Sequence, residues 1–295
     1  PRVRRQRQMC IRDSLQLYIC MCYNPKKRKV IFMIDGHMHL EYGDLSKEYI
    51  LQFVESAVKN GMDEIQILDH THRFKEFRPV YEGVRKASPY QEEWLNNKEM
   101  KFHSTLDEYC ALIKEIKAMD LPIKVSFGLE VCYVPEYEET IREILKPYHF
   151  DFLVGAIHSI DGKLYDMKWS EEILWNKYPV DKIYKRYYEC VFSLVKSDLF
   201  TQLAHPDTIK MFGHYPTYDL QPTYDELAEL LNEHHMKAEN NVGCYYRYHT
   251  LDIGLSDQLL QTFKKHHVQM ITASDAHHPE DVGRNIADVW DKTMK

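Results

Sequence analysis

Two pairs of potential metal ligands lie near opposite ends of the 295-residue chain. His37 and His39 end an apolar segment near the start, and Asp275 and His277 end another near the C-terminus. Side chains two residues apart on a strand project to the same face, so each pair could bind one metal ion. A ring-shaped fold would bring the two pairs together. The pattern therefore predicts a metal-dependent hydrolase.

Further histidines and a carboxylate follow the strands predicted between these pairs, namely Asp69-His70, Glu130, His158 and His205. In a barrel of parallel strands, functional residues gather at the carboxyl ends. A single histidine at a strand end is more often a hydrogen-bonded polar group than a metal ligand. Six strand ends with such residues at one rim reverse this expectation and favour metal binding. The set is rich in His and lacks Cys, which suits Zn²⁺, Mn²⁺ or Fe²⁺ better than Ca²⁺ or Mg²⁺. Eight ligands imply two or three ions, with Glu130 as the bridging carboxylate.

The elements that must position these residues alternate regularly after Met33. Strands are expected at 33–37, 65–69, 124–130, 151–157, 200–204, 236–239 and 268–274. Helices are expected at 46–60, 104–120, 136–147, 180–198, 223–235, 255–267 and 281–293. Ser46 and Asn60-Gly61 mark the ends of the first helix, and Ser104 marks the start of the second. Seven strand–helix units imply a parallel sheet covered by helices, either a barrel or an open doubly wound sheet.

The loop after the first strand is not glycine-rich, which disfavours a dinucleotide-binding domain. A long insertion, residues 71–103, separates the second and third strands and is rich in aromatic residues, among them Phe74, Phe77, Tyr81, Tyr90 and Trp94. Two interpretations have equal weight for it. The insertion forms a lid over the site, or its aromatic side chains pack against the edge of the barrel.

Composition excludes several classes of protein. The chain is 44% hydrophobic and 28% charged with a formal net charge of −7, as in one or two globular domains. An acidic balance argues against binding to a nucleic-acid polymer, and no apolar run reaches the roughly 18 residues of a membrane span. Cys110, Cys132, Cys190 and Cys244 show no CxxC spacing. Reduced thiols and a cytoplasmic, bacterial-type location are therefore expected.

The first 32 residues differ from the rest, because they contain nine Lys or Arg and one acid. A targeting peptide, a basic nucleic-acid arm and translated non-coding DNA are the alternatives. Residues 25–30 look like a nuclear localisation signal, whereas the apolar stretch 15–22 is too short and interrupted for a secretory signal. Residues 9–14 resemble the translated read-through of a transposase sequencing adaptor. We favour an artefactual extension 1–32, followed by a metallophosphatase domain 33–295.

Taken in order, the ligand motifs resemble those of the PHP (polymerase and histidinol phosphatase) family. Residues 70–74 and 203–207 look like its histidinol-phosphate phosphatase branch. The resemblance covers essentially all of 33–295. It implies a distorted, seven-stranded (β/α)₇ TIM-like barrel, the PHP fold, with a centre of up to three metal ions.

The resemblance also implies how the ligands divide among the ions. The first ion would be held by His37, His39, Glu130 and Asp275, the second by Glu130, His158 and His205, and the third by His70 and His277. Family members often have another histidine a few residues after the first pair, and this chain has none there. Asp44 is the possible substitute, and the alternative is a third ion that binds loosely or not at all.

The activity expected from this resemblance is hydrolysis of a phosphomonoester, most directly L-histidinol phosphate, by a hydroxide that bridges two ions at Glu130. The third ion, or Asp275 or His277 through a bound water molecule, could help the alkoxide leave. Arg186 is the first candidate for binding the phosphate group, and the alternative for it is a solvated helix face.

Arg73 is the second candidate for the phosphate. Glu239 could accept the amine of histidinol or only orient neighbouring loops. The alternative substrates are a small nucleotide or another phosphorylated metabolite, and a remote alternative is a non-catalytic metal-binding protein. The sequence does not indicate an oligomeric state.

Overall fold

The strands of the barrel form one parallel sheet with the order β1-β2-β3-β4-β7-β8-β9. This computed structural model describes residues 32–294. The strands are β1 (Ile34–His39), β2 (Glu64–Leu68), β3 (Lys124–Cys132), β4 (Phe152–Ala156), β7 (Gln202–Leu203), β8 (Lys237–Asn241) and β9 (Met270–Ala273). All seven predicted strands are confirmed. Strand order follows chain order, as in a barrel built from successive strand–helix units.

The first and last strands meet, so the sheet is a nearly closed barrel. The amide of His39 donates to the carbonyl of Ala276 at 2.7 Å. The carboxylate of Asp35 on β1, which is fully buried, accepts from the amide and hydroxyl of Ser274 at 2.8 and 2.6 Å and from the amide of Gly283. These bonds join segments almost 240 residues apart. The predicted distorted (β/α)₇ barrel is therefore confirmed.

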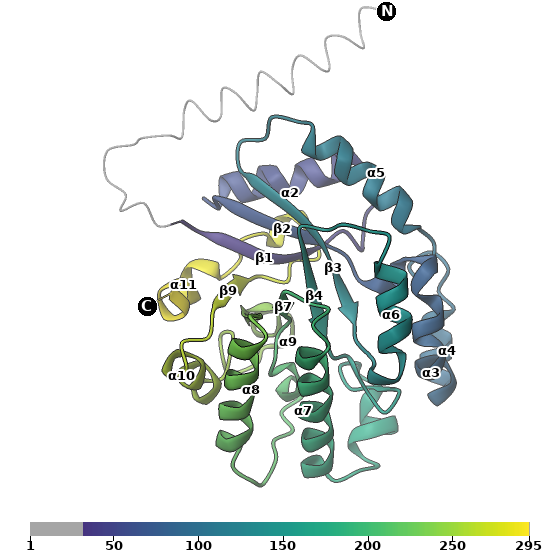
Figure 1. Ribbon diagram of the computed structural model, residues 1–295, viewed down its shortest axis with the longest axis vertical. Coiled ribbons are helices and arrows are strands. Elements are labelled where there is room, and N and C mark those ends of the chain that lie inside the picture. The colour runs from purple at the N-terminus through teal and green to yellow at the C-terminus, as the bar shows by residue number, and fades with distance from the viewer. Residues whose placement is uncertain (1–31, 295) are drawn as a thin grey trace, which may run out of the picture. The chain divides into compact units, whose positions relative to one another are not determined.

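Helices cover the outside of the strands, as Figure 1 shows. They are α2 (Lys47–Lys59), α5 (Leu106–Lys117), α6 (Glu138–Leu145), α7 (Val180–Lys196), α8 (Gln221–Glu233), α10 (Asp257–Lys265) and α11 (Ile286–Met294). Each buries an apolar stripe against the barrel, for example Ile50, Phe53 and Val54 of α2. Every predicted helix is present, although α11 begins five residues later than expected.

Local capping explains the helix ends. The hydroxyl of Ser46 accepts from the amide of Tyr49, and Asn60 is the C-cap of α2, followed by Gly61 at a positive φ of 73°. The start of α5 is a correction. Thr105, rather than Ser104, is the N-cap, because Thr105 and Glu108 form a reciprocal capping box.

The insertion between β2 and β3 packs into the core. It comprises the 3₁₀ segments η1 (Thr71–Arg73) and η2 (Lys75–Tyr81) and the helices α3 (Glu82–Ala87) and α4 (Pro89–Leu95). Phe74, Phe77 and Tyr81 are at most 2% exposed. Aromatic packing, rather than a free lid, is therefore the correct interpretation for this part. These elements were not predicted because each is too short to show periodicity.

Other short elements also escaped prediction. They are the hairpin β5 (Ser159–Ile160) and β6 (Lys163–Leu164), the π-helical turn η4 (Glu171–Trp175), the helix α9 (Gly243–Tyr248), and the 3₁₀ turns η3 (Pro135–Tyr137), η5 (Thr208–Lys210) and η6 (Pro279–Asp281). Most of them follow the carboxyl ends of strands. They therefore line the rim where ligands were expected.

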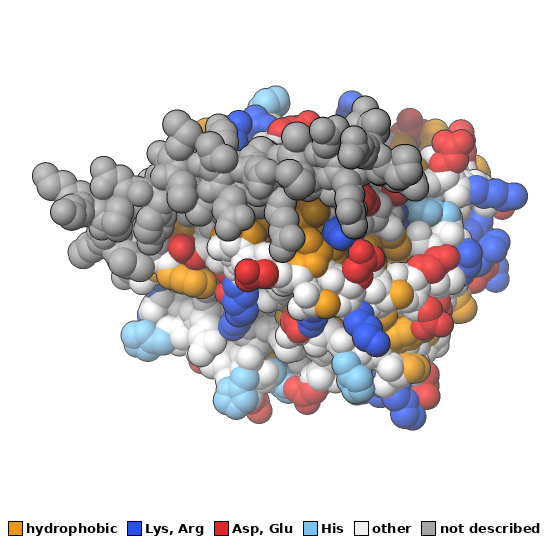
Figure 2. Space-filling view, turned by 90° about the horizontal axis from the view of Figure 1, so that it is seen from above, with side chains coloured by type: hydrophobic (Ala, Val, Ile, Leu, Met, Phe, Trp, Pro, Cys, Tyr) orange, Lys and Arg blue, Asp and Glu red, His pale blue; other side chains and the backbone are white. Residues whose placement is uncertain are grey.

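Among residues 32–294, no helix is long and apolar enough to cross a membrane. On the face visible in Figure 2, acidic and basic side chains are interspersed. No basic stripe crosses the described surface in that view. The predicted extension 1–32 lies, apart from Phe32, outside the described residues, and its origin stays a prediction.

Candidate metal centre

The first pair of histidines lies inside the barrel mouth. His37 and His39 are fully buried, and their Nε2 atoms are 2.9 Å apart. Asp275 Oδ1 lies 3.2 Å from His39 Nε2 and 3.7 Å from His37 Nε2. Ligands that share one Zn²⁺ at about 2.0–2.2 Å must approach one another this closely. The three residues therefore fit one ion.

Asp275 and His277 are not on a strand. Strand β9 ends at Ala273, and Asp275 has a positive φ of 58°. The sequence argument that both side chains project from one face of a strand is therefore wrong for this pair. The chain turns at Asp275, so that Asp275 faces His37 and His39 while His277 faces a different group of residues.

Glu130, near the end of β3, lies at the middle of the histidines. Its Oε1 atom is 2.9 Å from His205 Nε2 and 3.3 Å from His158 Nε2. Its Oε2 atom is 2.6 Å from His70 Nδ1. The two oxygens thus face different imidazoles, as expected of a carboxylate that bridges ions.

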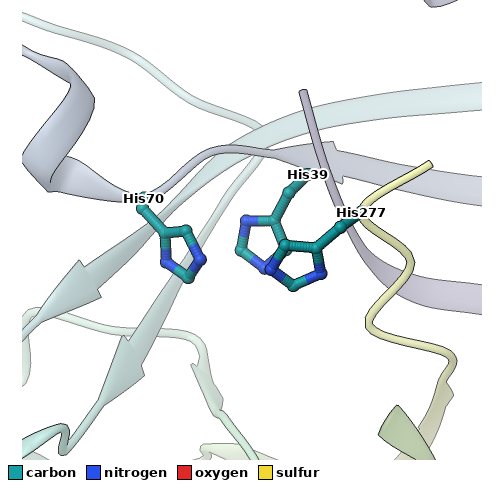
Figure 3. Close-up of side chains that lie close together, drawn as sticks. All are labelled: His39, His70 and His277. Carbon is teal, nitrogen blue, oxygen red and sulfur yellow. The ribbon is translucent and has the colours of Figure 1, made fainter. Parts of the chain in front are cut away.

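A second group of histidines forms beside the first. His39, His70 and His277 come from β1, from the loop after β2 and from the loop after β9, and their rings point toward one another (Figure 3). The ring centres of His39 and His70 are 3.9 Å apart, and those of His39 and His277 are 4.3 Å apart. His70 and His277, the pair expected at a third ion, are thus adjacent.

Glu41, rather than Asp44, lies beside the two histidines expected to bind the third ion. Asp44 is exposed and belongs to none of the potential ligand groups among the described residues. Glu41 Oε2 lies 3.7 Å from both His70 Nε2 and His277 Nε2. The sequence did contain a signal for it, because Glu41 continues the two-residue spacing of His37 and His39.

Glu239 lies within β8, which continues to Asn241, and it is fully buried. Its carboxylate accepts from His37 Nδ1 at 2.7 Å, from Gln202 Nε2 at 2.8 Å and from Asn241 Nδ2 at 3.0 Å. With its oxygens occupied and no exposure, Glu239 cannot receive a substrate amine. It instead fixes the ring of His37 with Nε2 toward the site.

The structure also corrects the role expected of Arg73. Its side chain is 2% exposed, and it donates to Asp69 Oδ2 at 2.9 Å and to the carbonyls of Leu40 and Gly43 at 2.8 Å. Asp69 in turn accepts from the amide of His70. Arg73 therefore holds the loops after β1 and β2 together and is not open to a phosphate group.

Arg186 lies on α7, away from the histidines. Its guanidinium pairs with Asp161 at 2.8 Å, Glu189 at 3.1 Å and Glu136 at 3.5 Å. The alternative of a solvated helix face is correct for Arg186. Helical periodicity alone could not show which face of α7 meets the barrel mouth.

Two residues that the sequence did not single out contact the cluster. Asp166, after the β5–β6 hairpin, lies 2.8 Å from His158 Nδ1. Arg247, on α9, lies 2.6 Å from Asp275 Oδ2 and 2.6 Å from His277 Nδ1. Neither belongs to a recognisable motif, so only the fold brings them to the site.

Comparison with known proteins decides the family. The family model of the PHP domain matches residues 35–242, which is more than half of the chain. The chain belongs to the PHP family. The model begins at β1 and ends after β8, so it spans most of the barrel described above.

Relatives of this PHP protein share its length at low identity. It is 22% identical over 266 residues to histidinol-phosphatase of Bacillus subtilis, covering 84% of this chain and 95% of that one. The structure of histidinol phosphate phosphatase from Lactococcus lactis, complexed with zinc, L-histidinol and phosphate, has a TM-score of 0.63 at 18% identity, covering 88% and 92%. A structure from Listeria monocytogenes has a TM-score of 0.67 at 16% identity, covering 86% and 99%. These two structures support the fold.

The charges of this PHP centre suit divalent ions. Burial alone would raise the pKa of Asp275, but Arg247 and His37 hold it well below its usual range. Burial likewise opposes ionisation of Glu130, whose pKa His70 and His158 nevertheless keep well below normal. Both carboxylates are therefore ionised, as metal binding requires.

The imidazoles divide into two groups. Burial and Arg247 lower the pKa of His277 to about 4, so this ring is neutral. Burial also lowers the pKa of His37, but Glu239, Glu130 and Asp275 outweigh it and raise the value to about 10. The carboxylates thus attract positive charge into the site. Divalent ions would supply that charge and leave the rings neutral as ligands.

Proposed function

We propose that this PHP protein is a metal-dependent phosphomonoesterase that hydrolyses L-histidinol phosphate to L-histidinol and phosphate. The observation that carries the proposal is the position of Glu130 between His158, His205 and His70. The full-length relative named histidinol-phosphatase and the neighbour complexed with zinc, L-histidinol and phosphate support the choice of substrate.

Two or three divalent ions of Zn, Mn or Fe fit the cluster. Their proposed ligands are His37, His39, Glu130 and Asp275 for the first, Glu130, His158 and His205 for the second, and His70 and His277 for a third. The ions when bound supply Lewis acidity, which lowers the pKa of water and neutralises charge on a phosphoryl group. Glu239 and Asp166 keep His37 and His158 in the tautomer that presents Nε2 to the centre.

Arg247 replaces Arg186 as the proposed phosphate-binding residue. The side chain of Arg247 is 26% exposed, unlike the buried side chain of Arg73. Its Nε atom is buried and has no hydrogen-bond partner among the described residues. A buried donor without an acceptor costs about 1–3 kcal/mol. A phosphoryl oxygen is the acceptor that this fork-shaped cation matches.

Asp275 and His277 remain the proposed groups for proton transfer to the leaving alkoxide through water. Both contact Arg247, which would place them beside a phosphate held by that residue.

The test is phosphate release from histidinol phosphate, sugar phosphates and nucleotides, with Mn²⁺ or Zn²⁺ added. We expect histidinol phosphate to be the preferred substrate, and His158→Ala to lose both activity and metal. Lys47→Met is the control, because Lys47 pairs with Glu115 on the outer helices. Robust turnover of a nucleotide without release from histidinol phosphate would overturn the proposed substrate. Full activity and metal content in His158→Ala would overturn the site.

A further inference from the structure

A buried lysine from the insertion contacts the edge of the cluster. Lys101 is 6% exposed, and its Nζ atom lies 3.1 Å from Glu41 Oε1 and 3.0 Å from His72 Nε2. The ammonium also lies 4.3 Å from the centre of the Trp94 ring. A buried ammonium is costly unless it is paired. Lys101 is therefore held at this position by specific partners, and the proposed reaction gives it no role.

Two overlapping groups compete for the third ion. One consists of His39, His70 and His277, and the other of Glu41, His70 and His72. Both use His70, so the fold must decide whether His277 or His72 joins it. The sequence cannot decide this, because His72 is as close to His70 along the chain as His39 is to His37.

Lys101 excludes His72. Both ring nitrogens of His72 lie near the ammonium, at 3.0 and 3.3 Å from Nζ. An ion bound to His72 would have to lie within a few ångströms of this charge. At about 4 Å, two unit charges repel by about 4 kcal/mol at a partly buried site, and a divalent ion would be repelled more.

The same lysine orients Glu41. One carboxylate oxygen, Oε1, faces Lys101, while the other, Oε2, lies 3.7 Å from both His70 Nε2 and His277 Nε2. Because Oε1 is bonded to Lys101, Oε2 stays directed at His70 and His277. These are the two histidines for which the sequence supplied no third metal ligand. Groups that fix a ligand in this way commonly change metal affinity about 10–100-fold when removed.

We propose that Lys101 is a positioning residue that makes Glu41 the ligand completing a third metal position with His70 and His277, and that it keeps ions away from His72. In this chain, a glutamate held by a lysine takes the place of the missing histidine. The inference rests on the metal centre of the proposed function, but not on the identity of the substrate.

The experiment is a metal titration of the apo-protein with Zn²⁺ or Mn²⁺, with bound ions counted by elemental analysis and dissociation constants measured by calorimetry. We expect three ions in the wild type and two in Glu41→Gln. Lys101→Met should weaken the third ion about 10–100-fold, and Lys101→Arg should restore part of that loss. His72→Ala should still bind three ions, and Lys47→Met is the matched control for losing a lysine charge.

Several outcomes would overturn the proposal. They are two ions in the wild type, unchanged third-ion affinity in Lys101→Met, or loss of an ion in His72→Ala. If Lys101→Met does not fold, as judged by circular dichroism, Glu41→Gln, Lys101→Arg and His72→Ala still decide the question. The titration uses no substrate. A failure to hydrolyse histidinol phosphate would therefore overturn the proposed function and leave this inference standing.

Discussion

The two sides of the cluster differ in how their side chains are held. On the strand side, His37, His39 and Glu130 project from β1 and β3 and are at most 1% exposed. On the loop side, His70 and His277 follow the ends of β2 and β9, and their side chains are 17% and 16% exposed. Backbone ladders thus fix one side, whereas the other depends on contacts between loops.

The partners of the ligands follow the same division. His37 on the strand side is fixed by Glu239, which is buried within β8. Asp275 on the loop side is fixed by Arg247, and Glu41 by Lys101, from segments outside the strands. Ion pairs between loops can change during evolution without disturbing the barrel. We therefore expect the loop side to tolerate more change than the strand side, although both supply proposed ion ligands.

Removing the ions should have the largest effect, because both sides depend on them. We expect a chelator such as EDTA to abolish phosphate release and to lower the melting temperature. Ions present at about 100 times their dissociation constant contribute about 2.7 kcal/mol to the free energy of unfolding. Calorimetry with and without added Zn²⁺ or Mn²⁺ measures this. Full activity after exhaustive chelation would contradict a metal-dependent reaction.

Glu130→Gln should be the most damaging single substitution on the strand side. It removes the carboxylate that faces His70 through one oxygen and His158 and His205 through the other. A loss of several kcal/mol of charge stabilisation corresponds to a decrease in kcat of about 10³-fold or more. Steady-state kinetics and metal content measure it. A decrease below tenfold would show that Glu130 does not bridge ions.

Arg247→Ala tests the loop side, where the substrate should bind. We expect kcat/KM to fall about 10²-fold, since a charge-assisted bond to a phosphoryl oxygen contributes roughly 1.5–3 kcal/mol. Arg247→Lys should recover little, because an ammonium cannot contact both Asp275 and His277 in the same plane. An unchanged KM for substrate and unchanged inhibition by inorganic phosphate would refute the assignment.

Glu239→Gln tests the strand side alone, because Glu239 should contact a metal ligand but no substrate. It keeps the size of the side chain but weakens the bond to His37 Nδ1. We expect a 10–100-fold decrease in affinity for the first ion. KM measured at saturating metal should not change. A selective rise in KM for histidinol phosphate would instead support the amine-binding role that the structure contradicts.

Arg186→Gln should have the smallest effect. Its guanidinium pairs with carboxylates on and near α7, and such partly exposed pairs contribute about 0–1 kcal/mol to stability. We expect phosphate release within about twofold of the wild type and a nearly unchanged melting temperature. A large rise in KM would mean that Arg186 reaches the substrate after all.

Much of the barrel was predictable because its strands and helices are regular. Apolar runs and amphipathic periods located all seven parallel strands and the seven long helices that cover them. The failures occurred in short elements. Helix α9 has six residues, too few to show a period, and yet it carries Arg247 to the site.

The site was also predictable only in part, because the proposed metal ligands were located but the substrate-binding residues were not. The eight residues proposed as ligands were found from their positions at predicted strand ends, and the structure places them in one cluster. The three residues chosen for substrate binding were not found there as free groups. Arg186 lies outside, and Arg73 and Glu239 are buried with their polar atoms occupied. A charged residue on a helix or within a strand gives no indication of which neighbour will neutralise it.

The sequence by itself therefore determined the succession of strands and helices and the kinds of groups at the carboxyl ends of the strands, because period and spacing are properties of the chain. Only the tertiary structure decided how those groups are shared. It grouped Asp275 with His37 and His39 but His277 with His39 and His70, and it brought Arg247 to Asp275 and Lys101 to Glu41. These contacts join residues 28 and 60 positions apart. Their pairing depends on how loops from different strands meet at one rim, which no local pattern encodes.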